Sequence, residues 1–185
     1  ENVVQLKGRV AGAISTSSNE LLVTELIFTN VFKGMDAGQI AALLSCFVYG
    51  DGGGSKDTDD TPRLRTELEQ PYRLLRDSAK RVAKVMEENE ALEDMSVEEY
   101  VDSFDPGLME IVYEWVNGKK FFEICKLNKK IYEGTIIRCM RRLEELIAEL
   151  KKATKVVGDG MLREKFEQCS TKIRRDIIFA ASLYL

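Results

Sequence analysis

Histidine is absent from this sequence of 185 residues, and proline occurs only 3 times. Without an imidazole, the chain cannot use a histidine base, a Ser-His-Asp or Cys-His pair, or a histidine-bound metal. This absence excludes most hydrolases, and no pair of carboxylates is marked as an acid and base couple. We therefore expect no catalytic residues, no metal site and no cofactor in this chain.

Cysteine and long apolar runs are also scarce. The 4 cysteines form no C-x-x-C pair, which predicts free thiols in a reducing compartment. No apolar run approaches the roughly 18 residues of a membrane span, and the N-terminus lacks a signal-peptide pattern. We expect an intracellular protein without a membrane partner. Because the chain opens with Glu1 rather than Met, we also expect a piece of a longer polypeptide.

The charge of the chain is unevenly distributed. Lys and Arg total 27 against 31 for Asp and Glu, so the net charge is −4 and a globally basic surface is excluded. Residues 119–152 nevertheless carry a net charge of +5, and the rest of the chain carries −9. Such a local excess favours contact with a nucleic-acid backbone. The alternative is an ordinary solvated helix face with Arg141–Glu145 and Arg142–Glu145 ion pairs.

Apolar residues recur mainly at spacings of three and four, which predicts an all-α protein. We expect residues 1–18 to be an extended lead-in from a preceding domain, with the extended stretch at 3–15. Residues 19–185 should form a single multi-helix bundle with two long C-terminal helices. The predicted helices span 19–30, 36–49, 62–69, 72–90, 96–103, 106–117, 119–127, 132–157 and 160–182.

Short side chains that can cap a helix mark several of these beginnings. The predicted caps are Ser17 with Glu20, Ser96 with Glu99, Thr61 with Pro62, and Asp105 with Pro106. Glycines at 34, 118 and 158 follow apolar runs, as left-handed residues after a helix do. Pro71 should separate two helices, since a proline inside a helix costs about 3 kcal/mol.

The glycine-rich stretch at 50–60 predicts a flexible acidic loop or a linker. It does not match the G-x-x-x-x-G-K-[ST] pattern of a phosphate-binding loop.

The predicted helix at 132–157 carries two distinct faces. Its apolar seam consists of Ile136, Met140, Leu143, Ile147 and Leu150. A second face carries Arg138, Arg142, Glu145 and Glu149, with Arg141 beside them. Two arginines four residues apart repel each other unless an anion lies over them, and the anion could be a carboxylate or a phosphate.

Two further apolar sets complete the expected core. The final helix should pack on the seam through Leu162, Phe166, Cys169, Ile173, Ile177 and Ala180. Aromatic side chains on apolar faces are more often core than stacking platforms, and we assign to the core Phe104, Tyr113, Trp115, Phe121 and Phe122.

Several runs together resemble a known family. They are 7–11, 20–28, 42–47, 100–104, 112–115, 132–138, 141–146 and 172–185. The chain resembles the DSHCT domain, the C-terminal helical domain of superkiller-type DExH-box RNA helicases. The opening K-G-R-V-A and the terminal run are most similar to the nuclear, exosome-associated branch, which works with the TRAMP polyadenylation complex.

The resemblance implies a role in handling single-stranded RNA. The domain would pack on RecA-like motor domains of the same polypeptide, and its ratchet helix, here 132–157, would line the RNA exit. The implied RNA contacts are Arg142 and Glu145, with Arg138 and Arg141 as neighbours. The parent would be a nuclear 3′–5′ helicase that uses ATP and Mg²⁺ and feeds RNA to the exosome together with TRAMP subunits.

The family's ATPase motifs are absent from this chain, so the resemblance implies helicase activity only for the parent. The main alternative is a structural bundle that docks on motor domains without contacting RNA. A stand-alone enzyme is disfavoured by the missing histidine and nucleotide motifs.

Overall fold

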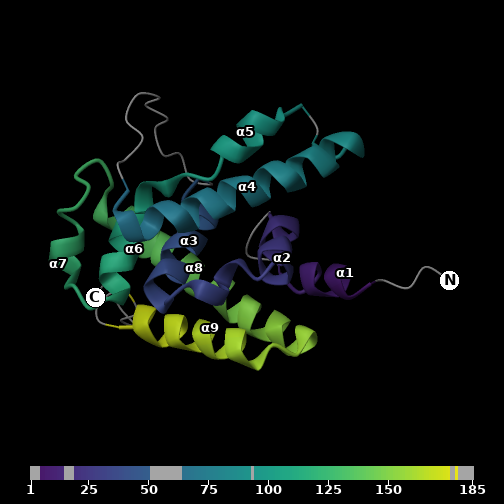
Figure 1. Ribbon diagram of the computed structural model, residues 1–185. Coiled ribbons are helices and arrows are strands. Elements are labelled where there is room, and N and C mark those ends of the chain that lie inside the picture. Colours follow the sequence, from purple (N-terminus) through teal and green to yellow (C-terminus); the bar gives the residue numbers. More distant parts are fainter. Residues whose placement is uncertain (1–4, 15–18, 51–63, 93, 176–177, 179–185) are drawn as a thin grey trace.

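The computed structural model describes residues 5–14, 19–50, 64–92, 94–175 and 178, and their regular structure is entirely helical (Figure 1). The all-α prediction is confirmed. The helices are α1 (Leu6–Ala11), α2 (Glu20–Phe28), η1 (Val31–Gly34), α3 (Ala37–Tyr49), α4 (Thr66–Glu88), α5 (Val97–Asp102), η3 (Pro106–Leu108), α6 (Met109–Val116), α7 (Phe121–Ile124), α8 (Glu133–Val157) and α9 (Gly160–Ile173). No helix within the described ranges has the length and apolar character needed to cross a membrane.

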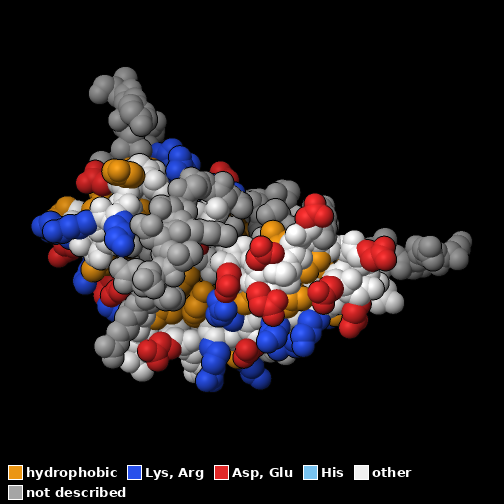
Figure 2. Space-filling model, turned by 90° about the horizontal axis from the view of Figure 1, so that it is seen from above, with side chains coloured by type: hydrophobic (Ala, Val, Ile, Leu, Met, Phe, Trp, Pro, Cys, Tyr) orange, Lys and Arg blue, Asp and Glu red, His pale blue; other side chains and the backbone are white. Residues whose placement is uncertain are grey.

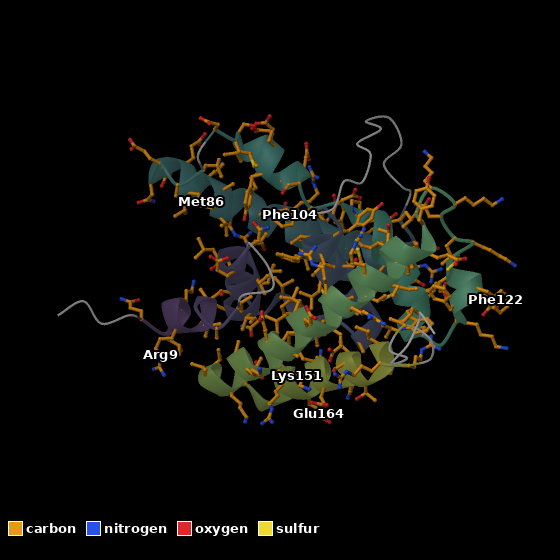
Figure 3. All side chains as sticks on the ribbon, turned by 180° about the vertical axis from the view of Figure 1, so that it is seen from behind. Arg9, Met86, Phe104, Phe122, Lys151 and Glu164 are labelled. Atoms are coloured by element: carbon orange, nitrogen blue, oxygen red, sulfur yellow. The ribbon has the colours of Figure 1, made fainter. Side chains whose placement is uncertain are left out.

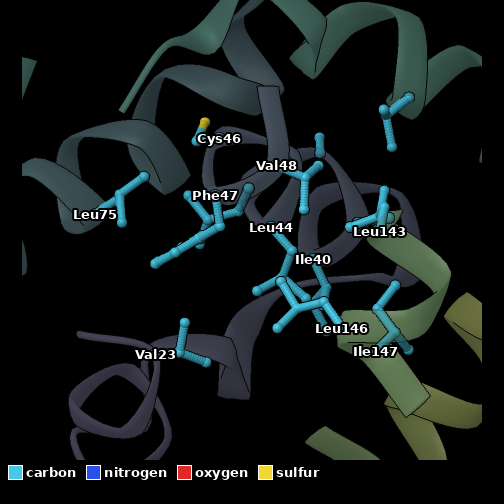
Figure 4. Packing of buried hydrophobic residues seen from close by; sticks show 14 of the residues in the cluster. Val23, Ile40, Leu44, Cys46, Phe47, Val48, Leu75, Leu143, Leu146 and Ile147 are labelled. Atoms are coloured by element: carbon cyan, nitrogen blue, oxygen red, sulfur yellow. The ribbon is translucent and has the colours of Figure 1, made fainter. Parts of the chain in front are cut away.

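Helix α3 forms the centre of the bundle. Its side chains are almost all apolar and buried, so it packs on several sides at once, against α4, α6, α8 and α9. Figure 4 shows Leu44 and Phe47 of α3 among Leu75 of α4 and Leu146 of α8. Gly38 allows close packing on α6, because a Cβ there would lie 3.1 Å from the Tyr113 ring.

Helices α8 and α9 form a pair beside α3, on the side opposite α4 (Figure 1). The whole predicted seam of α8 is buried, which confirms its assignment to the core. Gly158 ends α8 with a left-handed φ of 82°, as predicted, and Asp159 caps α9 by accepting from the Leu162 N–H at 2.9 Å. The turn between the two helices is therefore fixed at both ends.

The predicted cap at Ser96 is confirmed. Its hydroxyl accepts from the Glu99 N–H at 3.2 Å, and the Glu99 carboxylate accepts from the Ser96 N–H at 2.8 Å. Asp105 accepts from the Gly107 N–H at 2.7 Å and starts η3, which leads directly into α6.

The other two predicted caps involve residues outside the described ranges. Ser17, Thr61 and Pro62 are among them, as are residues 51–60 of the acidic glycine loop. The N-cap of α2 is Asn19, and α4 begins only at Thr66.

Two of the three predicted glycine stops are confirmed. Gly118 and Gly158 have φ values of 103° and 82°. The prediction for Gly34 is wrong, because Gly34 is the last residue of the short helix η1 and has no positive φ. The left-handed residue after α2 is Asn30, with a φ of 57°, and asparagine tolerates this conformation better than most residues.

The prediction that Pro71 separates two helices is wrong, because α4 runs through it from Thr66 to Glu88. A proline inside a helix leaves the carbonyl four residues earlier without its helical donor. Here that carbonyl belongs to Glu67, and it accepts a hydrogen bond from the Gln39 side chain at 2.9 Å. A neighbouring helix thus satisfies the carbonyl that Pro71 leaves unpaired.

The predicted extended stretch at 3–15 is also wrong where it is described, because Leu6–Ala11 form the short helix α1. Lys7 forms an ion pair with Glu25 of α2 at 2.9 Å, and Val10 is fully buried. Contacts with α2 and α8 stabilise a helix too short to form alone.

The last helix is shorter than predicted, since α9 ends at Ile173 and not at residue 182. In a longer helix the Ile173 oxygen would accept the N–H four residues later. It accepts instead from the indole Nε1 of Trp115 at 3.0 Å. The predicted packing of Leu162, Phe166, Cys169 and Ile173 is confirmed by their burial, whereas Ile177 and Ala180 lie outside the described residues.

Candidate nucleic-acid interface

The four predicted contact residues all lie on α8, a helix of 25 residues. One face of α8 packs on α3, α9 and α1, so the helix is held from several sides. Arg138, Arg141 and Glu145 are exposed on the opposite face, and Arg142 is half-buried at its edge. Arg142 is therefore partly solvated.

Arg141 differs from the other three residues because it donates a hydrogen bond to the backbone after α9. Its Nε donates to the backbone oxygen of Ile178 at 2.9 Å. One donor of the guanidinium therefore holds the segment that follows α9, and the remaining donors lie on an exposed side chain. Arg141 has a structural role whatever else it contacts.

The Cys139 thiol, between Arg138 and Arg142 in the sequence, donates to the Val48 oxygen of α3 at 3.7 Å. Burial raises the pKa of Cys139, and the positive charges of Arg138 and Arg142 partly offset this effect. Arg138 and Arg142 therefore lie close enough to this thiol to act on it electrostatically.

Glu145 is exposed, and no ion pair joins it to any residue in the part of the chain that the structure describes. The Arg141–Glu145 and Arg142–Glu145 pairs expected for an ordinary solvated face are therefore wrong. The Glu145 carboxylate remains accessible to a hydrogen-bond donor from outside.

Two other charged residues of α8, Lys151 and Glu144, pair with α9 and with the residue that follows it. Lys151 lies 2.6 Å from the Glu167 carboxylate, which lowers the pKa of Glu167. The Glu144 carboxylate accepts from the Ser170 hydroxyl and from Arg174 Nε, both at 3.0 Å. These bonds fix the α9 side of the helix and leave the face with Arg138 and Glu145 to solvent.

Phe122, assigned to the core from the sequence, is 56% exposed, so that assignment is wrong. Adjacent residues in a helix point about 100° apart, and Phe121 takes the inward position, 6.4 Å from the Trp115 ring. Lys126 lies four residues after Phe122 and 5.1 Å from its ring centroid. This Phe–Lys spacing was the signal available in the sequence. Phe104 and Trp115 are buried, as predicted.

The cysteine thiols are all free, as predicted. Cys46, Cys139 and Cys169 are buried, and burial raises the pKa of Cys169 to about 12. A thiol with a raised pKa is a poor nucleophile. Within the described ranges, no three acidic or cysteine side chains cluster as metal ligands.

Comparison with known proteins relates the chain to a family of helical domains. The model of the DSHCT (NUC185) domain matches residues 1–180. The chain is 46% identical to the human "Exosome RNA helicase MTR4" over 184 residues, which is 100% of this chain and 17% of that protein.

Two further relatives cover the same domain. The Schizosaccharomyces pombe "ATP-dependent RNA helicase mtr4" is 45% identical over 185 residues, 100% of this chain and 16% of that protein. The human "Superkiller complex protein 2" is 41% identical over 181 residues, 98% of this chain and 14% of that protein. The chain thus spans about a sixth of the length of the curated relatives it matches.

Proposed function

Because this chain belongs to the DSHCT (NUC185) domain family, we propose that it is the accessory helical domain of an ATP-dependent RNA helicase. The exposed face of α8 contacts the single-stranded RNA that the motor domains move. The domain itself performs no catalysis. ATP and Mg²⁺ belong to the motor domains outside this chain, since its sequence contains no phosphate-binding loop.

The wider role follows from the relatives. One of them is called an exosome RNA helicase, and we propose that the parent of this chain is a nuclear 3′–5′ helicase that feeds RNA to the exosome. Its partners would be the RecA-like motor domains of the same polypeptide, the exosome and TRAMP-type polyadenylation subunits. The K-G-R-V-A opening and the terminal run favour this branch over the superkiller branch.

The proposal depends on one observation about α8, namely that one face of the helix is buried and the other is exposed. The helix is fixed on its buried side, yet Arg138 and Glu145 are presented to solvent on the other. Arginine binds phosphate through a rigid fork of donors, and a carboxylate can accept from a ribose 2′-hydroxyl or a base edge. We assign phosphate contacts to Arg142 and Arg138, and a ribose or base contact to Glu145.

The test is strand separation by the full-length protein on a duplex with a single-stranded 3′ tail. We expect Arg142→Ala to lower the unwinding rate strongly and Glu145→Ala to lower it less. Surface substitutions usually change the free energy of unfolding by less than about 0.5 kcal/mol, so Glu145→Ala should leave the melting temperature nearly constant. Because Arg142 is half-buried, unwinding by Arg142→Ala is compared at equal amounts of folded protein. Arg163→Ala, an exposed arginine of α9, is the matched control and should leave unwinding unchanged. Wild-type unwinding in both α8 variants would contradict the proposal.

One observation favours the alternative of a docking bundle without RNA contact. Arg141 already binds the Ile178 oxygen, so part of the basic face serves the packing of the chain itself. If docking were the only role, the α8 variants would lower the melting temperature and leave RNA handling unchanged in the folded protein.

A further inference from the structure

The segment 119–132, which we call the lysine–aromatic segment, forms one end of the bundle. It contains α7 and the turns that lead into α8. In Figure 3 Phe122 lies at the outer edge of the molecule and points away from the bundle. Phe122 is 56% exposed and Tyr132, the N-cap of α8, is 81% exposed. Two aromatic rings thus face solvent on a short stretch of chain.

The backbone that carries these exposed rings is firmly packed against the rest of the bundle. Phe121 packs edge-on against Trp115, and Ile124 and Ile131 are buried. The guanidinium of Arg175 donates to the Lys119 oxygen at 2.6 Å. The backbone beneath the rings is therefore fixed to α6 and to the end of α9.

The same segment is strongly basic. It contains five lysines and one glutamate, and the Glu123 carboxylate is used to cap α7, accepting from the Lys120 N–H at 2.8 Å. Lys119 pairs with Glu114 at 3.3 Å. Lys120, Lys126 and Lys129 form no ion pair with any described residue. At the left end of Figure 2, where Figure 1 places α7, blue side chains lie beside orange hydrophobic atoms.

We infer that the lysine–aromatic segment is a second binding surface for single-stranded RNA, separate from the α8 face. Bases stack on the rings of Phe122 and Tyr132, and phosphates lie over Lys120, Lys126 and Lys129. Aromatic rings set among cationic side chains are the common arrangement for binding single strands without sequence preference. This inference rests on the proposed function, because it extends the path of the same strand.

The chemistry of the segment distinguishes RNA from a protein partner. A protein interface core is depleted in lysine, whereas a phosphate backbone supplies one negative charge per nucleotide. Lys126 already lies beside the Phe122 ring, so a base on that ring would have its phosphate near an ammonium group. The segment leads directly into α8, and Tyr132 precedes Arg138 by about 9 Å along the helix axis at 1.5 Å per residue.

The experiment measures the affinity of the full-length protein for a single-stranded oligoadenylate of about thirty nucleotides, which is long enough to cover both surfaces. We expect Phe122→Ala with Tyr132→Ala to weaken binding about fivefold or more, because both stacking rings are lost. Arg142→Ala should also weaken binding, through the α8 face. Met161→Ala, a 78% exposed side chain on α9, is the matched control.

Substitutions that keep part of the side chain separate stacking from apolar docking. Phe122→Leu keeps an apolar surface but loses the ring face, so it should behave like Phe122→Ala for RNA. Tyr132→Phe keeps the ring and should bind like the unaltered protein. If Phe122→Leu retains full RNA affinity and only the alanine variant loses a protein partner, the segment docks a protein and the inference is overturned.

The result also separates this inference from the proposed function. If the aromatic double variant binds the oligonucleotide normally while Arg142→Ala weakens binding, the second surface does not exist and the α8 contact stands. If Arg142→Ala is also without effect, the proposed function fails with it. Both rings are exposed, and unchanged melting temperatures will show that the variants are folded.

Discussion

The indole Nε1 of Trp115 donates a hydrogen bond to the backbone oxygen of Ile173, 58 residues later and 3.0 Å away. Arg175 stacks on the same indole with its guanidinium carbon 3.7 Å from the ring centroid, and it donates to the Trp115 and Lys119 oxygens. The tryptophan therefore ends α9 and holds the segment after it. Arg141 of α8 holds the same segment at Ile178, which links the end of the chain to the proposed RNA face.

Replacing Trp115 by Phe should destabilise the chain at the end of α9. Phenylalanine keeps an aromatic ring but cannot donate to the Ile173 oxygen, and a lost buried hydrogen bond costs about 1–3 kcal/mol. The smaller ring adds a packing loss. The free energy of unfolding from urea titrations measures the change, and Arg175→Ala should be destabilising as well. An unchanged unfolding midpoint for Trp115→Phe would show that the indole hydrogen bond contributes nothing.

A second prediction concerns Gln39 and Pro71. Gln39→Ala should lower the free energy of unfolding by about 1–2 kcal/mol, because it leaves the Glu67 oxygen unpaired and removes half of the α3 cap. In a Pro71→Ala background the new N–H can bind the Glu67 oxygen within α4. The cost of Gln39→Ala should then be smaller by about 1 kcal/mol, measured as a double-mutant cycle. Additive effects would show that Gln39 does not compensate for Pro71.

These two contacts also show why the sequence predicted the fold only in part. The periodicity of α8 and the caps at Ser96 and Asp105 are local, and they were predictable from the residues next to them. The continuity of α4 at Pro71 depends on Gln39 of another helix, and the end of α9 depends on Trp115. Residues that are neighbours in the sequence do not predict hydrogen bonds to residues far away in the chain.

The candidate site shows the same division. Helical spacing placed Arg138, Arg142, Glu145 and Glu149 on one polar face, with Arg141 beside it. In the structure Arg138, Arg141 and Glu145 are exposed, whereas Arg142 and Glu149 are half-buried. The engagement of Arg141 by Ile178 depends on the path of the chain after α9, which spacing could not give. Phe122 was missed because aromatic residues are usually buried, although its neighbour Phe121 already occupies the inward position.

Lys165 should stabilise the bundle although it is a charged residue. Its ammonium group donates to the backbone oxygens of Phe32, Lys33 and Met35 at 3.2, 2.7 and 2.9 Å, and so joins α9 to η1 and the turn that follows. Lys165→Met keeps most of the aliphatic chain and removes the donors. We expect a loss of about 2 kcal/mol in the free energy of unfolding, since hydrogen bonds from charged groups are worth about 1.5–3 kcal/mol. Lys172→Met, on an exposed lysine of the same helix, is the control and should change little.

Alkaline pH should destabilise the chain through Cys169. Burial raises its pKa from the ordinary value of 9.0 to about 12, and its thiol donates to the Ala37 oxygen at 3.3 Å. The folded state therefore keeps a proton that the unfolded state loses above pH 9, so the contribution is complete below pH 9 and falls as the pH rises towards 12. The expected slope is about 1.4 kcal/mol per pH unit from this thiol. Urea titrations at several pH values measure it.

Cys169→Ala should reduce that slope while lowering stability at neutral pH through the lost packing. Cys125→Ala is the matched control, because Cys125 is only partly buried. If the slope above pH 9 is the same in Cys169→Ala as in the unaltered chain, the buried thiol is not the group that titrates.

The salt dependence of RNA binding should divide between the two basic surfaces. For single strands, the logarithm of affinity falls with the logarithm of salt concentration by about 0.7 for each phosphate neutralised. Arg142→Ala in the full-length protein should therefore reduce the slope for single-stranded RNA by about 0.7. Lys120→Gln, Lys126→Gln and Lys129→Gln together should reduce it by about 2. Phe122→Ala should lower the affinity and leave the slope unchanged, because a stacked base releases no counterion. A bundle that only docks on motor domains would keep the wild-type slope in every one of these variants.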